Sequence, residues 1–493
     1  MSVSNLHMYV MAVPLLTAMF VNLFGRRSDT VIATLTIGSL AFSSLASLAV
    51  LANVLQVGRI SYVAGNWQAP FGIELVVDPL SAVMLALISV IALLASFSTL
   101  KSVGQELPGR GHQFFALYLI LIAGLMGLVL TGDAFNLYVM LEITSITSYG
   151  LIAMGKGRAP LASFNYVIMG SVGACFYLLG VAYLYLMTGT LNMADLAQIL
   201  PTIGGGAAVA TALGFMLVGL WVKMAFFPLH GWLPNAYSLA PTGVALIAAP
   251  LMTKVTIYLM VRIMFWVFSA DFLFIEHALV QSGIVWAASF AIIFGSVMAL
   301  GQRDLKKMLT YIIVAEVGYM VGGVWLANAT GMTGAVLHIV NDALMTLCLF
   351  LAVAAIVYKL GGSEFDRLQG IYRKMPITMA AFTVGAFSMI GVPPTAGFFS
   401  KWYLILGGIE AGHWEYVIAL VLSSLINAVL FFRIIEIGYF FKDENDHGHE
   451  KRAEAPLVMQ APLLISAAVL IVIGLSSGPL VESIIKLALP AGF

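Results

Sequence analysis

The chain alternates between long apolar segments and short stretches that hold most of its charges. A helix needs about 20 apolar residues to cross the hydrocarbon core of a bilayer. Segments of that length begin near Met8, Val31, Pro79, Phe114, Ala134, Asn165, Ala207, Val244, Val280, Leu309, Gly331, Met379, Tyr416 and Val458. The pattern predicts an all-α integral membrane protein with about fourteen transmembrane helices, numbered here in chain order.

Two shorter stretches, Leu191–Leu200 and Glu482–Leu489, are expected to be helices that lie in the membrane interface. The first apolar segment has no positive run before it and no small-residue cleavage site after it. This predicts a retained helix, with a removed signal peptide as the alternative.

The composition excludes a soluble protein, because 61% of the 493 residues are apolar and only 9% are charged. Soluble domains carry about 25% charged residues. The 23 basic and 23 acidic residues cancel, so nothing favours a nucleic-acid partner, and the partner that the composition implies is the lipid bilayer.

The charges in the loops predict how the chain is oriented, because short cytoplasmic loops collect Lys and Arg. The loops that follow odd-numbered helices contain sixteen basic residues: Arg26, Arg27, Lys101, Arg110, Lys156, Arg158, Arg303, Lys306, Lys307, Lys359, Arg367, Arg373, Lys374, Lys442, Lys451 and Arg452. The other side has only Arg59 and Lys486. We therefore expect a multi-pass protein of the cytoplasmic membrane, with both termini outside the cytoplasm.

The remaining basic residues lie inside apolar segments, where a charge costs about 2.5–3.5 kcal/mol on insertion scales. They are Lys223, Lys254, Arg262, Lys401 and Arg433. The two arginines are near helix ends and are expected to have structural roles, Arg433 by pairing with Glu436. The three lysines have no such exit and are the candidates for chemistry.

Two of these lysines stand beside helix breakers. The seventh helix reads GLWVKMAFFPLHGWLP around Lys223, and the twelfth reads GAFSMIGVPPTAGFFSKWYLI up to and beyond Lys401. Interruptions at membrane depth are tolerated only where protein or a wet cavity satisfies the backbone. A broken helix in each half predicts two inverted repeats, helices four to eight and nine to thirteen, with the ion path at the breaks.

These repeats divide the chain into four parts. Residues 1–112 form an N-terminal three-helix segment, and residues 113–268 and 269–441 are the two repeats. Residues 442–493 form a cytoplasmic loop, the last transmembrane helix and an interfacial tail.

Glu142 lies in the middle of the fifth helix, in FNLYVMLEITSITSYG, where an unpaired carboxylate is costly. Burial raises the pKa of a carboxyl group and lowers that of a lysine, whereas pairing moves both back. A Glu142–Lys223 pair that opens and closes would therefore act as a proton switch. The alternative is a static ion pair that joins the fifth and seventh helices, although buried pairs stabilise poorly compared with apolar packing.

Other mid-chain residues extend this set of candidates. Lys223, Lys254 and Lys401 could form a series of basic sites, bridged by His230 and His338, since imidazole donates and accepts near neutral pH. Each histidine is equally compatible with hydrogen-bonded packing. Asp342 stands four residues after His338 on the same helical face, which allows a relay pair. Glu316 is the remaining buried carboxylate of this region.

No cofactor or metal site is predicted. The sequence has no phosphate-binding loop, no cysteine pattern for zinc or iron–sulfur and no nucleophile motif. Cys175 and Cys348 both lie in apolar segments, where cysteine behaves as a small hydrophobic residue. The chain is expected to translocate ions without a redox or hydrolytic site of its own, and any such chemistry would belong to another subunit.

At these residues the chain resembles the antiporter-like, proton-conducting membrane subunits shared by Mrp-type cation/proton antiporters, respiratory complex I and membrane-bound hydrogenases. The segments that carry the resemblance are FNLYVMLEITSITSYG, VKMAFFPLHGWLPNAYSLAPT, LMTKVTIYLMVRI, LGQRDLKKMLTYIIVAEVGYM and GVPPTAGFFSKW. The resemblance covers nearly the whole chain. It implies that Glu142, Lys223, Lys254 and Lys401 take part in proton translocation, and that the partners are other membrane subunits, protons and a monovalent cation.

Within this family, TKV around Lys254 and the GD-FNLY lead into Glu142 are most similar to the D-type subunit of Mrp antiporters. The complex I subunit otherwise most similar in helices seven and eight usually has glutamate where Lys401 stands. The chain also ends soon after the fourteenth helix, without the long lateral helix of the largest such complex I subunit.

The sequence departs from the family pattern at several positions. In HIVNDALMTLCLF, Asp342 and Thr346 occupy a region where a basic residue is common, so the central relay is expected to run through His338, Asp342 or water. Glu316 replaces a usual glutamine or serine, and either adds a proton site or accepts a hydrogen bond. Asn235 replaces a usual aspartate.

The leading hypothesis is therefore a proton-translocating subunit of a Mrp-like sodium/proton antiporter. The alternative is a proton-pumping subunit of complex I or a membrane-bound hydrogenase. A non-conducting scaffold is disfavoured, because it does not need three buried lysines and a buried glutamate. A solute carrier is disfavoured because no polar cluster suits an organic substrate.

Overall fold

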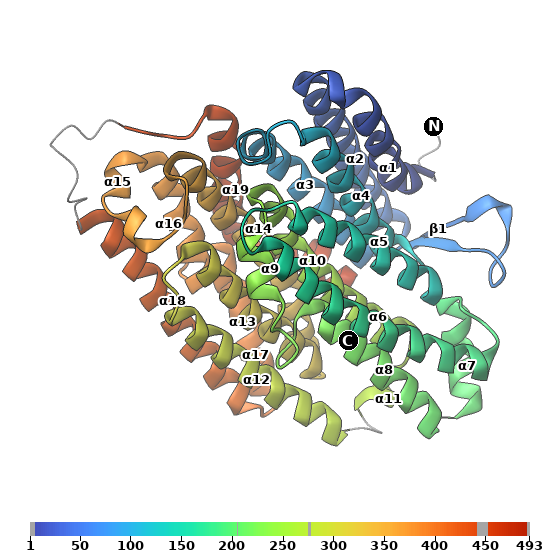
Figure 1. Cartoon of the computed structure of the whole chain (residues 1–493). Coiled ribbons are helices and arrows are strands. Elements are labelled where there is room, and N and C mark those ends of the chain that lie inside the picture. The colour runs from blue at the N-terminus through green and yellow to red at the C-terminus, as the bar shows by residue number, and fades with distance from the viewer. Residues whose placement is uncertain (1–4, 205, 275–277, 441–451, 491–493) are drawn as a thin grey trace.

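The computed structural model describes residues 5–204, 206–274, 278–440 and 452–490. Lys442 and Lys451, which contribute to the predicted loop charge, lie outside these ranges. The described chain is almost entirely helical (Figure 1). The elements of its N-terminal half are α1 (Leu6–Phe24), α2 (Asp29–Val57), β1 (Ile60–Val63), β2 (Glu74–Val77), α3 (Pro79–Glu106), α4 (Gly111–Leu130), α5 (Ala134–Ala153), α6 (Ala159–Thr188), α7 (Met193–Ile203), α8 (Ala207–Met224), α9 (Leu233–Leu239) and α10 (Thr242–Arg262).

The second half continues with a helical turn, Ile263–Val267, that extends α10. Its helices are α11 (Ala270–Phe274), α12 (Ala278–Leu300), α13 (Leu305–Trp325), α14 (Ala329–Leu360), α15 (Ile371–Lys374), α16 (Pro376–Ile390), α17 (Ala396–Glu410), α18 (Trp414–Phe440), α19 (Leu457–Leu475) and α20 (Ser477–Leu480).

Twelve helices in the described part of the chain are long and apolar enough to cross a membrane. They are α1, α2, α3, α4, α6, α8, α10, α12, α13, α14, α18 and α19. The other two predicted crossings fall at α5, which holds Glu142 among several hydroxyl residues, and at the interrupted pair α16 and α17. The multi-pass helical class is confirmed, and the count of fourteen crossings stays a prediction.

A small β-hairpin is present in addition to the helices. β1 and β2 pair antiparallel, with Ile60 opposite Val77 and Val63 opposite Glu74. The hairpin projects from one side of the helical bundle (Figure 1). Arg59, just before β1, and Glu74, the first residue of β2, approach to 4.0 Å. The predicted interfacial helix Leu191–Leu200 is present as α7, and α20 with the turns after it covers the expected position of the second one.

Polar residues at the helix ends fix where several helices begin. Asp78 and Ser81 form a reciprocal cap at the start of α3, followed by Pro79, which suits the first turn of a helix. Asp133 caps α5, and Asp304 caps α13 in the same manner. Such caps satisfy backbone N–H groups that have no partner within the helix.

The most deeply buried helix is α10, in which every residue from Thr242 to Arg262 is buried. It packs against α3, α8 and α14, and α14 packs against α16, α17 and α19. In Figure 1, α10 and α14 lie in the centre, with α5, α6 and α8 on one flank and α12, α17 and α18 on the other. The polar side chains of α10, and His338, Asp342 and Thr346 on α14, are therefore buried among other helices.

Both predicted helix breaks are present and have similar backbone geometry. The residues that follow α8 and α16, Ala225 and Gly391, are both in the left-handed region. In each break the next N–H group reaches back five residues, from Phe226 to the carbonyl of Trp221 and from Val392 to that of Phe387, at 2.9 Å in both. Each break also contains a cis X–Pro bond.

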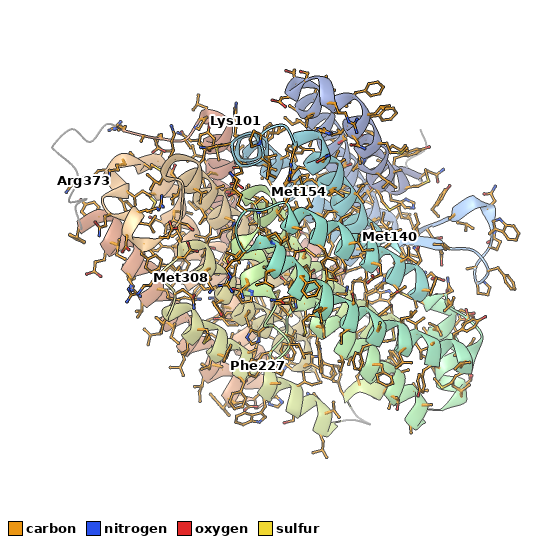
Figure 2. The ribbon with its side chains drawn as sticks, viewed as in Figure 1. Lys101, Met140, Met154, Phe227, Met308 and Arg373 are labelled. Carbon is orange, nitrogen blue, oxygen red and sulfur yellow. The ribbon has the colours of Figure 1, made fainter. Side chains whose placement is uncertain are left out.

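Basic residues of the predicted loops lie on different parts of the bundle. Lys101 and Arg373, which loop charge assigns to one side of the membrane, lie on parts of the bundle remote from the β1–β2 hairpin (Figure 2). Arg59, assigned to the opposite side, immediately precedes that hairpin.

Candidate functional site

The first candidate pair joins α5 to the end of α8. Lys223 Nζ lies 3.5 Å from Glu142 Oε1 and donates to the hydroxyl of Ser145 at 2.6 Å. The Lys223 side chain is 4% exposed and that of Glu142 is 28% exposed. The acid and base thus meet at the first helix break, with one partner buried and the other at the surface of the isolated chain.

A small cavity lies on the inner side of this pair. It has a volume of about 10 Å³ and is lined by Leu125, Leu128, Leu141, Thr144, Ser145, Tyr166, Lys223, Met252 and Thr256. That space suits about one water molecule, for which the hydroxyl groups in the lining are suitable partners. Because Met252 and Thr256 flank Lys254 on α10, the cavity adjoins the segment that holds the next lysine.

The second pair lies at the centre of the molecule. Lys254 Nζ is 2.7 Å from Asp342 Oδ2, and both side chains are completely buried. Asp342 Oδ1 also accepts a hydrogen bond from Thr346 at 3.0 Å. This ion pair connects α10 to α14. Removing one partner of such a buried pair destabilises the folded protein by about 3–5 kcal/mol, because the remaining charge is left unpaired.

A third group of charges lies between α13, α14 and α17. Glu316 Oε2 is 2.5 Å from His338 Nε2, and the other ring nitrogen of His338 is 2.9 Å from Ser400 Oγ. Lys401 Nζ lies 4.0 Å from Glu316 Oε1 and donates to the carbonyl of Met389 at 2.6 Å. Glu316 and His338 are fully buried and Lys401 is nearly so.

In the described residues, His338 and Asp342 each contact another helix and do not form the relay pair that their spacing allows. They stand one turn apart on α14, as expected, but His338 faces Glu316 and Asp342 faces Lys254. Their positions link the second and third groups through a single turn of helix. The three groups lie on helices that pack in sequence, with α8 against α10, α10 against α14, and α14 against α13 and α17. The charges are thus arranged in a row, from Glu142 and Lys223 through Lys254 and Asp342 to Glu316, His338 and Lys401.

His230 is not joined to this row by the contacts that the structure records. Its ring stacks on Phe227 with the centroids 5.5 Å apart and packs edge-to-face on Phe294 at 4.9 Å. Nδ1 of His230 is buried without a hydrogen-bond partner in the described part of the chain. The recorded contacts of His230 are thus aromatic packing, and its bridging role stays a prediction.

The two arginines have partners that the sequence did not reveal. Arg262 forms a buried ion pair with Asp78 at the start of α3 and stacks on Trp266. Arg433 donates to the carbonyl of Leu300 and lies over the ring of Phe365, instead of making the predicted contact with Glu436. The ion pair of Arg262 joins the end of α10 to the start of α3, and the hydrogen bond of Arg433 joins α18 to the end of α12, which fits the expected structural roles.

Sequence reasoning also missed the hydroxyl groups that hold the charged atoms. Ser145 and Ser400 contact Lys223 and His338, and Thr346 contacts Asp342. Each hydroxyl lies within one helical turn of a charged candidate or beside it in the sequence, which is the signal that could have identified them. Serine and threonine are too common in membrane helices for spacing alone to do so.

Comparison with known proteins identifies the chain's relatives. Residues 131–427 match the family described as "NADH:quinone oxidoreductase/Mrp antiporter, TM". The chain belongs to this family. The match includes all the charged candidates named above, from Glu142 to Lys401.

Two curated relatives cover almost the full length. The chain is 42% identical to the N subunit of the NADH-quinone oxidoreductase of Desulforudis audaxviator, over 99% of each chain. It is 31% identical to the D subunit of the Na(+)/H(+) antiporter of Alkalihalophilus pseudofirmus, over 98% of this chain and 97% of that one. Both branches that the sequence suggested are thus represented among its relatives.

Solved structures have the same fold. A chain of the archaeal membrane-bound sulfane sulfur reductase superposes with a TM-score of 0.91 at 29% identity, over 98% of this chain and 97% of that chain. A chain of the Mrp complex from Dietzia gives 0.88 at 26% identity, over 99% and 97%. Both neighbours are parts of multi-subunit membrane complexes, which supports membrane-protein partners for this family member.

Proposed function

We propose that this chain is the proton-translocating subunit of a Mrp-like complex that exchanges protons for sodium or another monovalent cation. The observation that carries the proposal is the row of acids and bases that begins at the half-buried Glu142 and continues through buried residues to Lys401, with a lysine beside each helix break. Full-length similarity to the antiporter D subunit of Alkalihalophilus pseudofirmus supports it.

The pairs suit proton movement because each charge depends on a neighbour. Lys223 holds its proton more strongly when Glu142 is close than when the pair is open, since an opposite charge favours the charged form. Opening that pair would therefore release a proton toward the cavity and Lys254. Asp342, His338 and Glu316 extend the route to Lys401, the last lysine of the row.

The alternative is a proton-pumping subunit of a redox-driven complex. The observation that favours it is the 42% identity to the N subunit of the NADH-quinone oxidoreductase of Desulforudis audaxviator. Genes for small Mrp membrane subunits beside this one would support the antiporter. Genes for quinone-site or metal-site subunits would support the pump.

Further parts of the proposal concern assembly and orientation. The protein works as one subunit of a hetero-oligomer in the cytoplasmic membrane, with both termini outside the cytoplasm. Helices four to eight and nine to thirteen form two inverted repeats. The matching geometry of the two breaks at Ala225 and Gly391 supports the repeats.

Proton or sodium flux in vesicles tests the proposed function. Lys223→Ala and Glu142→Ala should each abolish flux while the complex remains in the membrane, because each leaves its partner unmatched. Lys401→Ala should also block flux, and Lys401→Glu should retain some. Arg433→Ala is the control and should be mild, because Arg433 lies on the exterior of α18.

Abundance of the assembled complex is measured for every variant beside its flux. Near-normal flux in Lys223→Ala would refute the relay and leave a static ion pair between α5 and α8 as the better interpretation.

A further inference from the structure

The two halves of the chain have equivalent helix caps, from which corresponding residues can be counted. Asp133 caps α5 and Asp304 caps α13. The first N–H group of each helix donates to a distant carbonyl at 2.8 Å, Ala134 to Leu191 and Leu305 to Ser363.

Counted from these caps, Ser145 of α5 and Glu316 of α13 occupy the same position. The position of Glu142 is taken by Ile313. The acid of the second half thus stands one helical turn further along its helix than the acid of the first half. It occupies the place where Ser145 holds the amine of Lys223.

The lysine of the second half is displaced as well. Lys223 is next to the last residue of α8, and Met389 has that place in α16. Lys401 instead comes after the break, on α17, and its amine reaches back to the carbonyl of Met389 at 2.6 Å. Although Lys401 comes after the break, its amine contacts the carbonyl of Met389, which is the residue that corresponds to Lys223. The amine is thus brought back toward the position that the Lys223 residue has in the first half.

The glycine at the second break makes room for this reach. A Cβ atom at Gly391 would lie 3.2 Å from Cδ of Lys401, which is a crowded contact. Ala225 occupies the same left-handed position in the first break, where no lysine crosses. The second break is therefore shaped to let the Lys401 stem pass.

Only one of the two carboxylate oxygens of Glu316 has a hydrogen-bond partner in the described residues. Oε2 faces His338 at 2.5 Å. Oε1 has no hydrogen-bond donor in the described residues, although it is buried, and Lys401 Nζ is 4.0 Å away. A buried carboxylate oxygen without a donor is costly, and a shift of the Lys401 amine by about 1 Å would bring it to hydrogen-bonding distance.

We propose that Glu316 is a switch carboxylate for which the Lys401 ammonium and the protonated ring of His338 compete. This inference rests on the proposed function, because it assigns a step of the same proton route. With Lys401 on the Met389 carbonyl, Glu316 pairs with protonated His338. When Lys401 moves to Oε1, the negative charge of Glu316 is matched by the ammonium, and the ring gives up its extra proton.

In the proposed step the proton leaves Nδ1 for the hydroxyl of Ser400, 2.9 Å away, and this hydroxyl, which otherwise donates to the carbonyl of Gly397 at 3.3 Å, passes its own proton to a water molecule. The return of Lys401 to Met389 reverses the step. Other polar or charged groups near the site are the ring of Tyr319, 5.0 Å from Lys401, and Asp342, which is already paired with Lys254. Glu316 is therefore the carboxylate that Lys401 and His338 share.

Nuclear magnetic resonance of the assembled complex in vesicles, with ¹⁵N-labelled histidine, tests the competition directly. The His338 signal is identified by its loss in His338→Gln. Lys401→Met removes the competitor, so His338 should keep its proton to higher pH than in the wild type. Glu316→Gln removes the counter-charge, so His338 should lose its proton at lower pH. Unchanged titration in both variants would overturn the inference.

Flux measurements separate this inference from the proposed function. Glu316→Gln should reduce flux to the level of protein-free vesicles, Glu316→Asp should restore part of it, and Glu410→Gln at the exposed end of α17 should behave as wild type. If Glu142→Gln abolishes flux but Glu316→Gln matches Glu410→Gln, only the switch is wrong. If Glu142→Gln and Lys223→Ala also leave flux unchanged, the proposed function itself fails.

Discussion

At the scale of single residues, the Lys254–Asp342 pair combines complete burial with a separation of 2.7 Å. We predict that Lys254→Met lowers the stability of the complex by about 3–5 kcal/mol, because Asp342 is left unmatched in the interior. The double variant Lys254→Met/Asp342→Leu should recover most of that loss and still block flux. Resistance to unfolding by detergent, measured beside flux, checks both statements.

Lys359→Met is the matched control, since Lys359 lies on the same helix as Asp342 but is exposed. It should change stability by less than about 1 kcal/mol. If Lys254→Met/Asp342→Leu is as unstable as Lys254→Met, the loss of stability does not come from leaving Asp342 unpaired.

The sequence could predict which residues belong to the site but only some of their contacts. Glu142 and Lys223 were identifiable because each is an isolated charge in an apolar helix, and the structure brings them together. The partner of Asp342 was not predictable, because helical spacing places it near His338, whereas its actual partner depends on how α10 packs against α14. Spacing within one helix is local information, and contacts between helices are not.

At the scale of the elements, the two broken helices differ in the position of their lysine. Lys223 comes before its break, on α8, and Lys401 comes after its break, on α17. We predict that moving this amine across the second break preserves function. Lys401→Met should block proton flux, and Met389→Lys combined with Lys401→Met should restore part of it. The reason is that position 389 corresponds to Lys223 and that its carbonyl already holds the Lys401 amine.

Ile390→Lys combined with Lys401→Met is the control, because the next position along a helix points about 100° away from its neighbour. Equal flux in the two double variants would contradict the predicted correspondence between the breaks.

The helices themselves were easier to predict than the hairpin. The fifth apolar segment was expected from Ala134, which is where α5 begins, and both breaks fall beside the prolines that predicted them. The β1–β2 hairpin was missed because its strands are only four residues long. The intervening stretch has Gly, Asn and Pro, the turn residues that were the available signal.

At the scale of the whole molecule, Lys306 connects the two predicted repeats. Loop charge counted it as a cytoplasmic residue, but it is buried, and its amine donates to the carbonyl of Ala240 at 2.7 Å. Ala240 lies between α9 and α10, whereas Lys306 lies in the first turn of α13. Thr310, one turn further along α13, also donates to the carbonyl of Pro234. The start of α13 is thus fastened to the region just after the first break.

We predict that Lys306→Met destabilises the assembled complex by about 1.5–3 kcal/mol, the usual contribution of a hydrogen bond to a charged group. Lys307→Met should cost much less, because Lys307 is half-exposed and carries the same charge at the same end of α13. Detergent unfolding of both variants gives the comparison. Equal losses would mean that the charge near the membrane surface matters, and not the bond to Ala240. A larger loss in Lys306→Met, together with wild-type flux per assembled complex, would assign Lys306 to holding the halves together and not to the proton route.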